Sequence, residues 1–361
     1  MTQVTNTGIG GRVAGLDELR GLSILWVMLS HSTALWTWMP FSFAGYGFHG
    51  VVLFFAISGY LITKILLEAE KQDDYFSNFY VNRVFRIWPL MLLALAVSAY
   101  LWPQMAPMGV FNLLMINNYA YAYGLEPMVR TDVMWSLAIE EQFYLIWPVL
   151  AYFYGKRGLA VIATVIIFLG FSFDAGLLPG GQNIISKTTH GNMQYIAMGC
   201  LVAVGRDSIR YMIGAWCAFM LFYMSMRGGV GGLVDFRWWW HGISFFLGLL
   251  VYLTVYWRPV VIWSPLAEIG KLCYGLYLIH FFISWAILEH FGRGMILQGS
   301  AFFLISYLLA FFSYRYFEKP IINSRNYFHA SMELKVVLFA GMGLMAMISA
   351  IMLIPTMKFM G

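Results

Sequence analysis

The chain has 361 residues, of which 61% are hydrophobic and 11% are charged, with a net charge of +5. Soluble domains carry about 25% charged residues, so this composition excludes an ordinary soluble globular protein. The basic residues are spread over many short segments and form no single patch, which argues against a nucleic-acid-binding protein.

Apolar stretches follow one another along almost the whole chain. A bilayer core about 30 Å thick needs about 20 apolar residues per helix. Eleven stretches meet or approach this length, at residues 21–39, 47–67, 87–105, 134–154, 159–178, 192–205, 209–226, 239–257, 270–290, 296–317 and 335–355. They predict an all-α polytopic membrane protein with about 11 transmembrane helices. No stretch leaves room for a soluble domain, so residues 1–361 are interpreted as one membrane domain.

The positions of lysine and arginine predict the orientation. If the N-terminus is cytoplasmic, 16 of the 22 basic residues fall in cytoplasmic segments and six fall outside. This excess follows the positive-inside rule and agrees with an odd number of spans. We therefore expect a cytoplasmic N-terminus, with basic segments that also favour anionic lipids.

The first predicted span carries two ionisable residues, Arg20 and His31. Eleven helical residues advance about 16 Å and about three turns, so both side chains share one face. Arg20 would lie at the cytoplasmic edge and His31 near mid-bilayer, which suits a long anionic cofactor whose reactive end enters first. Imidazole is a base near neutral pH. A buried histidine bonded to a neighbouring helix explains His31 equally well.

A second basic pair, Arg83 and Arg86, precedes the third span in FYVNRVFRIWP. A spacing of three places both guanidinium groups on one helical face. Guanidinium forks bind phosphates through two hydrogen bonds, so the pair suits a nucleotide-like donor. Anchoring of the span at the cytoplasmic surface explains the spacing equally well.

Two adjacent carboxylates, Glu140 and Glu141, lie within the fourth span in WSLAIEEQFYLIWP. Ionisable groups in lipid are costly and often functional. Neighbouring helical residues point about 100° apart, so we expect the two carboxylates to differ in role. His280 lies about ten residues into the ninth span and is either a structural residue or a second acid/base group.

Together these segments resemble acyltransferase family 3 of the membrane-bound acyltransferases. The resemblance runs from Leu16 to Pro320 and rests on six ordered motifs, which are LDELRGLSILWVMLSH, FFAISGYLIT, FYVNRVFRIWPL, WSLAIEEQFYLIWP, CYGLYLIH and YFEKP. It implies a ten-helix acyltransferase core at about 16–320, followed by an extra transmembrane helix at about 335–355. In HGNMQYIAMGCL, Asn192 stands where many relatives have arginine.

The resemblance implies transfer of an acetyl or other acyl group from cytoplasmic acyl-CoA, with acetyl-CoA as the usual donor. The acceptor would be a hydroxyl of a cell-surface or lipid-linked saccharide, such as exopolysaccharide or O-antigen, at the bacterial cytoplasmic (inner) membrane. No metal and no nucleic-acid partner are expected. The implied catalytic residues are His31, Glu140 and Glu141, the donor-binding residues are Arg20, Arg83 and Arg86, and possible acceptor or second acid/base residues are His280, Ser58 and Tyr60.

Two other functions agree with parts of the sequence. Acylation of a small molecule such as a macrolide would use the same motifs. A secondary transporter would also place Glu and His within the membrane, but such proteins usually contain inverted repeats, and the sequence shows none. Direct transfer and a covalent acyl-enzyme both agree with these residues.

Overall fold

The first ten predicted apolar stretches all form helices in the computed structural model of the chain. The structure describes residue 13 and residues 15–36, 45–69, 73–103, 108–125, 133–178, 187–226, 237–257, 263–294 and 296–325. The predicted eleventh span, 335–355, lies outside the described residues. Within them the secondary structure is helical, apart from an isolated β-bridge between Trp36 and Gly294.

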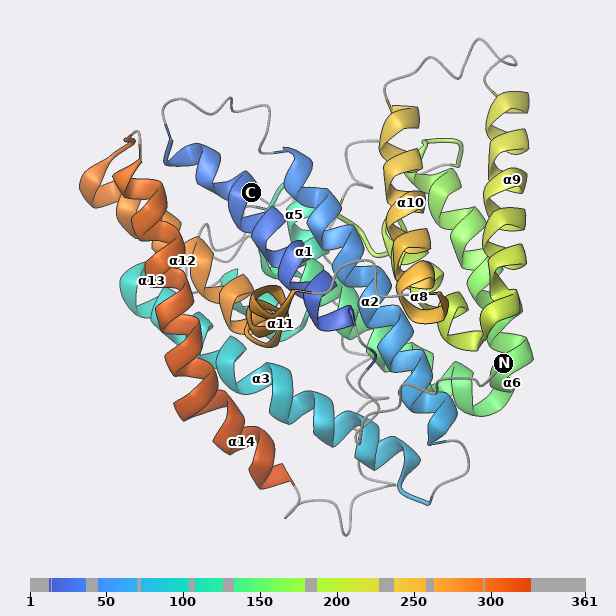
Figure 1. Cartoon of the computed structure of the whole chain (residues 1–361), viewed down its shortest axis with the longest axis horizontal. Helices are drawn as coiled ribbons and strands as arrows, with labels where there is room; N and C mark the ends of the chain where they lie inside the picture. Colours follow the sequence, from blue (N-terminus) through green and yellow to red (C-terminus); the bar gives the residue numbers. More distant parts are fainter. Residues whose placement is uncertain are drawn as a thin grey trace.

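The helices lie beside one another in a bundle, with α2 between α1 and the group that contains α8 and α10 (Figure 1). Their bounds are α1 Leu16–His31, α2 Gly47–Glu68, α3 Tyr75–Leu101, α4 Gly109–Leu113, α5 Asn117–Ala122, α6 Met134–Asp174, α8 Met193–Val204, α9 Ile209–Met226, α10 Arg237–Tyr256, α11 Ser264–Lys271, α12 Cys273–Phe291, α13 Leu297–Ser313 and α14 Lys319–Ser324. A π-helical turn, Tyr314–Glu318, joins α13 to α14.

Two helices have bounds that differ from the predicted spans. α1 ends at His31 and continues as a 3₁₀ turn over Ser32–Ala34, where the prediction extended the helix to residue 39. Hydroxyl groups of Ser30, Ser32 and Thr33 bond to carbonyls three residues earlier, which competes with regular helix. α3 begins at Tyr75, twelve residues before the predicted span, so Arg83 and Arg86 belong to the helix itself.

Five helical segments of the described chain are long and apolar enough to cross a membrane, and the bent pair α11–α12 adds a sixth. One of the five, α6, covers the two predicted spans 134–154 and 159–178. Gly155, with a left-handed φ of 56°, breaks the helix between them. α13 exposes Leu304, Leu308 and Phe312, as a lipid-facing helix would. A polytopic helical membrane protein is confirmed, whereas the count of about 11 spans stays a prediction.

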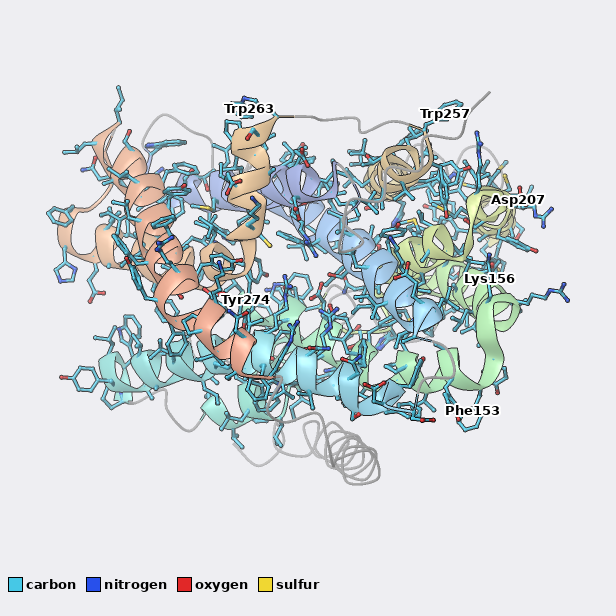
Figure 2. The ribbon with its side chains drawn as sticks, turned by 60° about the horizontal axis from the view of Figure 1, so that its bottom comes forward. Phe153, Lys156, Asp207, Trp257, Trp263 and Tyr274 are labelled. Carbon is cyan, nitrogen blue, oxygen red and sulfur yellow. The ribbon has the colours of Figure 1, made fainter. Side chains whose placement is uncertain are left out.

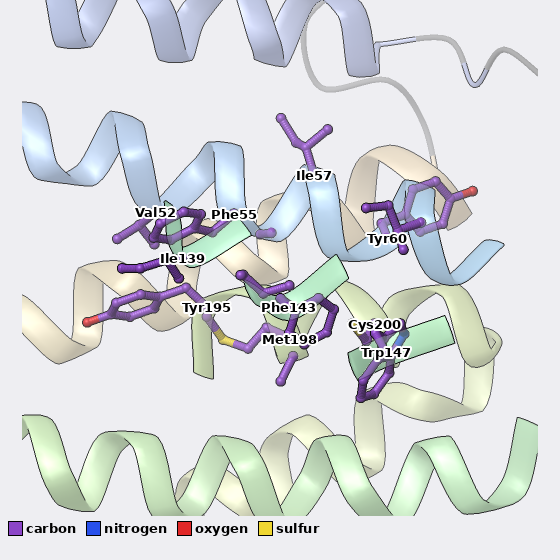
Figure 3. Close-up of a cluster of buried hydrophobic side chains, with 14 of the residues drawn as sticks. Val52, Phe55, Ile57, Tyr60, Ile139, Phe143, Trp147, Tyr195, Met198 and Cys200 are labelled. Atoms are coloured by element: carbon purple, nitrogen blue, oxygen red, sulfur yellow. The ribbon is translucent and has the colours of Figure 1, made fainter. Parts of the chain in front are cut away.

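The largest apolar cluster fills the space between α2, α6 and α8 (Figure 3). Phe55, Trp147 and Tyr195 lie fully buried there. The backbones of α2 and α8 come so close that a Cβ on Gly199 would lie 1.8 Å from the carbonyl oxygen of Ala56. Close approach at small residues is how helices associate in lipid, where hydrophobic burial supplies little driving force. This contact fixes α2 against α8.

A second apolar cluster joins α1 to α12 and α13 through Ile24, Leu276 and Phe302. α1 therefore packs against α2 on one side and against α12 on the other. Figure 2 shows Tyr274 of α12 inside the molecule, near α3 and α14, whereas Phe153, Trp257 and Trp263 lie at its periphery. The hydroxyl of Tyr274 donates to the carbonyl of Ile87, which ties α12 to α3.

Candidate active site

The structure brings two predicted histidines together from opposite ends of the chain. His31 is the last residue of α1 and His280 lies within α12. Nδ1 of His31 lies 2.9 Å from Nε2 of His280, and the ring planes differ by 8°. His280 is fully buried, while His31 is half-buried beside the edge of Phe281. The two imidazoles therefore form one hydrogen-bonded pair.

The other nitrogen of His280 fixes the direction of this hydrogen bond. Nδ1 of His280 lies 2.8 Å from the carbonyl oxygen of Leu276, which can only accept, so this nitrogen carries the proton. In a neutral pair Nε2 of His280 must then accept, and Nδ1 of His31 donates. The remaining ring nitrogen of His31, Nε2, keeps its lone pair and is the basic atom of the pair.

The predicted donor-binding arginines lie around one cavity between α1, α2, α3, α6 and α12. Its volume is about 710 Å³, including its open mouth, and its lining includes Arg20, Arg83 and Arg86. Arg20 pairs with Asp17 at 3.2 Å, and the guanidinium of Arg83 lies 5.0 Å from the ring centre of Tyr144. Three cationic groups at one cavity suit an anion with several charges.

One of the two adjacent glutamates faces this cavity. Glu140 lines it and accepts hydrogen bonds from Ser58 at 2.7 Å and from Tyr144 at 3.0 Å. Glu141 does not line it. Its Oε1 is buried without a hydrogen-bond partner among the described residues, while its carboxylate interacts with Trp88 and electrostatically with Arg83. As expected from their 100° separation, the two carboxylates have different surroundings.

The histidine pair adjoins the cavity at Tyr277. This tyrosine lines the cavity, and its ring centre lies 6.0 Å from that of His280. Its hydroxyl contacts Ser136 at 2.6 Å and donates to the carbonyl of Val133 at 2.7 Å. His31 itself is not part of the cavity lining. A donor in the cavity would therefore have to pass the ring of Tyr277 to reach His31.

The remaining predicted residues lie at different depths. Ser58 belongs to the cavity through its bond to Glu140, whereas Tyr60, two residues later, lies in the apolar cluster and does not line the cavity (Figure 3). Asn192 is buried at the start of α8 and donates to the carbonyl of Thr188 at 2.8 Å. Within the described chain no group of three or more His, Cys, Asp or Glu could hold a metal ion.

Sequence reasoning missed the tyrosines of the cavity. Tyr144 follows Glu140 by four residues, and Tyr274 and Tyr277 lie three apart in CYGLYLIH. Both spacings place side chains on one helical face. This periodicity was the signal that could have added them to the site.

The family model and the similar curated proteins agree on the broad class. The model of a family described as an acyltransferase domain matches residues 13–315. O-acetyltransferase OatA of Staphylococcus aureus is 27% identical over 351 residues, which cover 85% of this chain and 57% of the relative. Peptidoglycan O-acetyltransferase OatA of Listeria monocytogenes is 27% identical over 368 residues, covering 88% of this chain and 57% of the relative.

The putative peptidoglycan O-acetyltransferase YrhL of Bacillus subtilis is 25% identical over 358 residues, covering 86% of this chain and 55% of the relative. The chain thus spans a little over half the length of these curated relatives. No solved structure matches the chain. The match to the family model covers the helices that form the cavity and the histidine pair, from α1 to α13. The chain therefore belongs to the acyltransferase family that this domain defines.

Proposed function

We propose that the protein is a membrane-embedded O-acetyltransferase, which moves an acetyl group from acetyl-CoA to a hydroxyl of a cell-wall or cell-surface saccharide. The observation that carries the proposal is the adjacency of two features. A cavity with three guanidinium groups adjoins a histidine pair whose tautomers leave one basic nitrogen. The names of the relatives support acetyl as the group and favour a peptidoglycan glycan as the acceptor.

The donor follows from the charges of the cavity. Coenzyme A carries a 3′-phosphate and a diphosphate on its nucleotide end, joined by a thin pantetheine arm to the thioester. Arg20, Arg83 and Arg86 would hold phosphates through charge-assisted hydrogen bonds. The apolar residues of the same lining, such as Val51 and Phe54, would contact the arm. With a cytoplasmic N-terminus, this cavity would open toward the compartment that contains acetyl-CoA.

The histidine pair would act on the acceptor. Nε2 of His31 removes the proton of the acceptor hydroxyl, and the oxygen attacks the thioester carbonyl carbon. The tetrahedral intermediate collapses with breakage of the carbon–sulfur bond. The coenzyme A thiolate then takes the proton from His31, so an ester and a free thiol result. His280 holds the ring of His31 through the 2.9 Å hydrogen bond. Glu140 offsets part of the cationic charge around the donor.

The test uses full-length protein in proteoliposomes with acetyl-CoA labelled in the acetyl group. Peptidoglycan fragments, exopolysaccharide and O-antigen serve as separate acceptors, and alkali-labile label in the glycan measures ester formation. We expect transfer by the wild type and loss of at least about 100-fold in His31→Ala, the usual scale of an acid–base residue. His290→Ala is the matched control, because His290 is exposed on α12 and its ring bonds to the carbonyl of Ala286 in the same helix.

Two results would contradict the proposal. The first is full transfer by a folded, membrane-located His31→Ala protein. The second is a wild-type protein that neither binds acetyl-CoA nor labels any of the three glycans.

A further inference from the structure

A second cavity lies beside the arginine-lined one, and neither the sequence motifs nor the proposed reaction assigns it a role. Its volume is about 740 Å³, including its open mouth. The end of α2, the first turns of α3 and the residue after α14 form its walls, with Asn78, Asn82 and Arg325 among the lining residues. Arg83 and Arg86 line both cavities, so these two side chains form the wall between them.

The second cavity has a cationic side, and the rest of its lining is mixed apolar and polar. Arg83, Arg86 and Arg325 line it, and no Asp or Glu belongs to its described lining. None of the three arginines forms an ion pair with a carboxylate in the part of the chain that the structure describes. Arg83 interacts electrostatically with Glu140 and Glu141, and Arg86 with Glu318, but none of these carboxylates lines the second cavity. The guanidinium groups repel one another there, so an anion with several charges would stabilise them. The first cavity differs, since Glu140 lies in its wall.

The side-chain amides add neutral hydrogen-bonding groups. Nδ2 of Asn82 donates to Oδ1 of Asn78 at 2.6 Å, and Oδ1 of Asn82 is buried without a hydrogen-bond partner among the described residues. A buried acceptor of this kind is costly unless a donor reaches it. Phe79 supplies an aromatic surface in the same wall. The cavity thus offers cations, an unused acceptor and a ring, the groups that recognise a phosphorylated nucleotide.

We propose that this second cavity binds the adenosine 3′-phosphate end of the donor and that Arg325 pairs with the 3′-phosphate. The proposal rests on acetyl-CoA being the donor. The order of groups in coenzyme A matches the order of the site. The nucleotide occupies the outer cavity, the diphosphate lies at Arg83 and Arg86, and the pantetheine arm enters the inner cavity toward Tyr277. Arg325 lies beyond the residues matched by the family model, which end at residue 315.

The experiment compares coenzyme A with 3′-dephospho-coenzyme A, which lacks only the phosphate assigned to Arg325. Binding of each labelled compound to the full chain in lipid nanodiscs is measured at equilibrium, without any acceptor. We expect the wild type to bind coenzyme A about 10- to 100-fold more tightly, the scale of a charge-assisted phosphate contact. Arg325→Gln should lose most of this preference by weakening coenzyme A alone, with dephospho-coenzyme A unchanged.

Arg210→Gln is the matched control, since Arg210 is an exposed arginine that lines neither cavity. It should keep the wild-type preference. The assignment of Arg325 is overturned if Arg325→Gln keeps that preference or weakens both compounds equally. Equal binding of both compounds by the wild type overturns the 3′-phosphate site and leaves the donor intact. A wild type that binds neither compound overturns both this inference and the proposed donor.

Discussion

The hydrogen bond between His31 and His280 gives a sharp prediction for substitutions of His280. Asparagine at this position keeps a group near the carbonyl of Leu276 but is too short to reach His31, so Nδ1 of His31 loses the acceptor that it has at 2.9 Å. Glutamine is long enough to place its amide oxygen close to the position of Nε2. The two variants therefore separate the bond to His31 from the presence of a polar side chain on α12.

The expected loss of rate follows from the cost of leaving the Nδ1–H group of the half-buried His31 without a hydrogen-bond acceptor. This cost is about 1 to 3 kcal/mol. One factor of ten in rate corresponds to about 1.4 kcal/mol, so the range is about 5- to 150-fold. We expect kcat of His280→Asn to fall within this range. The KM for acetyl-CoA should change by less than about twofold, because the donor cavity is untouched. His280→Gln should recover a large part of kcat.

The assay is steady-state acetyl transfer with the acceptor that the wild type labels, with both substrates varied. Thermal unfolding of each variant in the same detergent shows whether α12 still packs. Wild-type kcat in His280→Asn would refute the orienting role of His280. Equal losses in the asparagine and glutamine variants, with lowered thermal stability in both, would assign His280 to packing alone.

Two further predictions concern the donor wall and the helix crossing. Arg86→Gln removes a charge from the wall between the two cavities. In the same assay it should raise the KM for acetyl-CoA about tenfold with little change in kcat. An unchanged KM would contradict the proposed placement of acetyl-CoA. Gly199→Ala should lower the unfolding temperature clearly, because its Cβ would lie 1.8 Å from the carbonyl oxygen of Ala56. Gly214→Ala in α9 is its control, since a Cβ there meets nothing within 4 Å. This substitution should be neutral or should stabilise the protein by up to about 1 kcal/mol. Equal effects of the two substitutions would show that α2 and α8 pack less closely than described.

The fold was predictable where apolar length and charge decide the structure. Each of the first ten apolar stretches forms a helix, because the backbone in lipid must satisfy its own hydrogen bonds. The ends of helices were less predictable. Hydrogen bonds from hydroxyl groups to nearby carbonyls end α1 at His31. α3 begins earlier than predicted, in the polar segment before Arg83, because a helical turn outside the apolar stretch does not need apolar residues on all sides. The prediction used apolarity alone and missed both.

The site was predictable at the level of single helices. The spacing of Arg83 and Arg86 indicated one face, and both residues line the same cavity. Contacts between distant helices were beyond the sequence. His31 and His280 are separated by 249 residues, and nothing in either motif indicates that they bond to each other. Arg325 reaches its cavity only through the packing of α14 against α3. Such contacts depend on the tertiary arrangement of helices and not on local pattern.

The π-helical turn between α13 and α14 has a consequence for the evolution of donor recognition. A π turn contains one residue more than the corresponding stretch of α-helix, and one residue rotates everything that follows by about 100°. In this chain the turn points Glu318 inward, where it accepts from Ser313 at 2.9 Å, and it sets the phase of α14 up to Arg325. A single-codon deletion within 314–318 would restore a regular helix and turn Arg325 away from its cavity, while every other side chain of the proposed donor site stayed the same. Insertion or loss of one residue is thus a short path by which a member of this family could change the coenzyme end that it recognises.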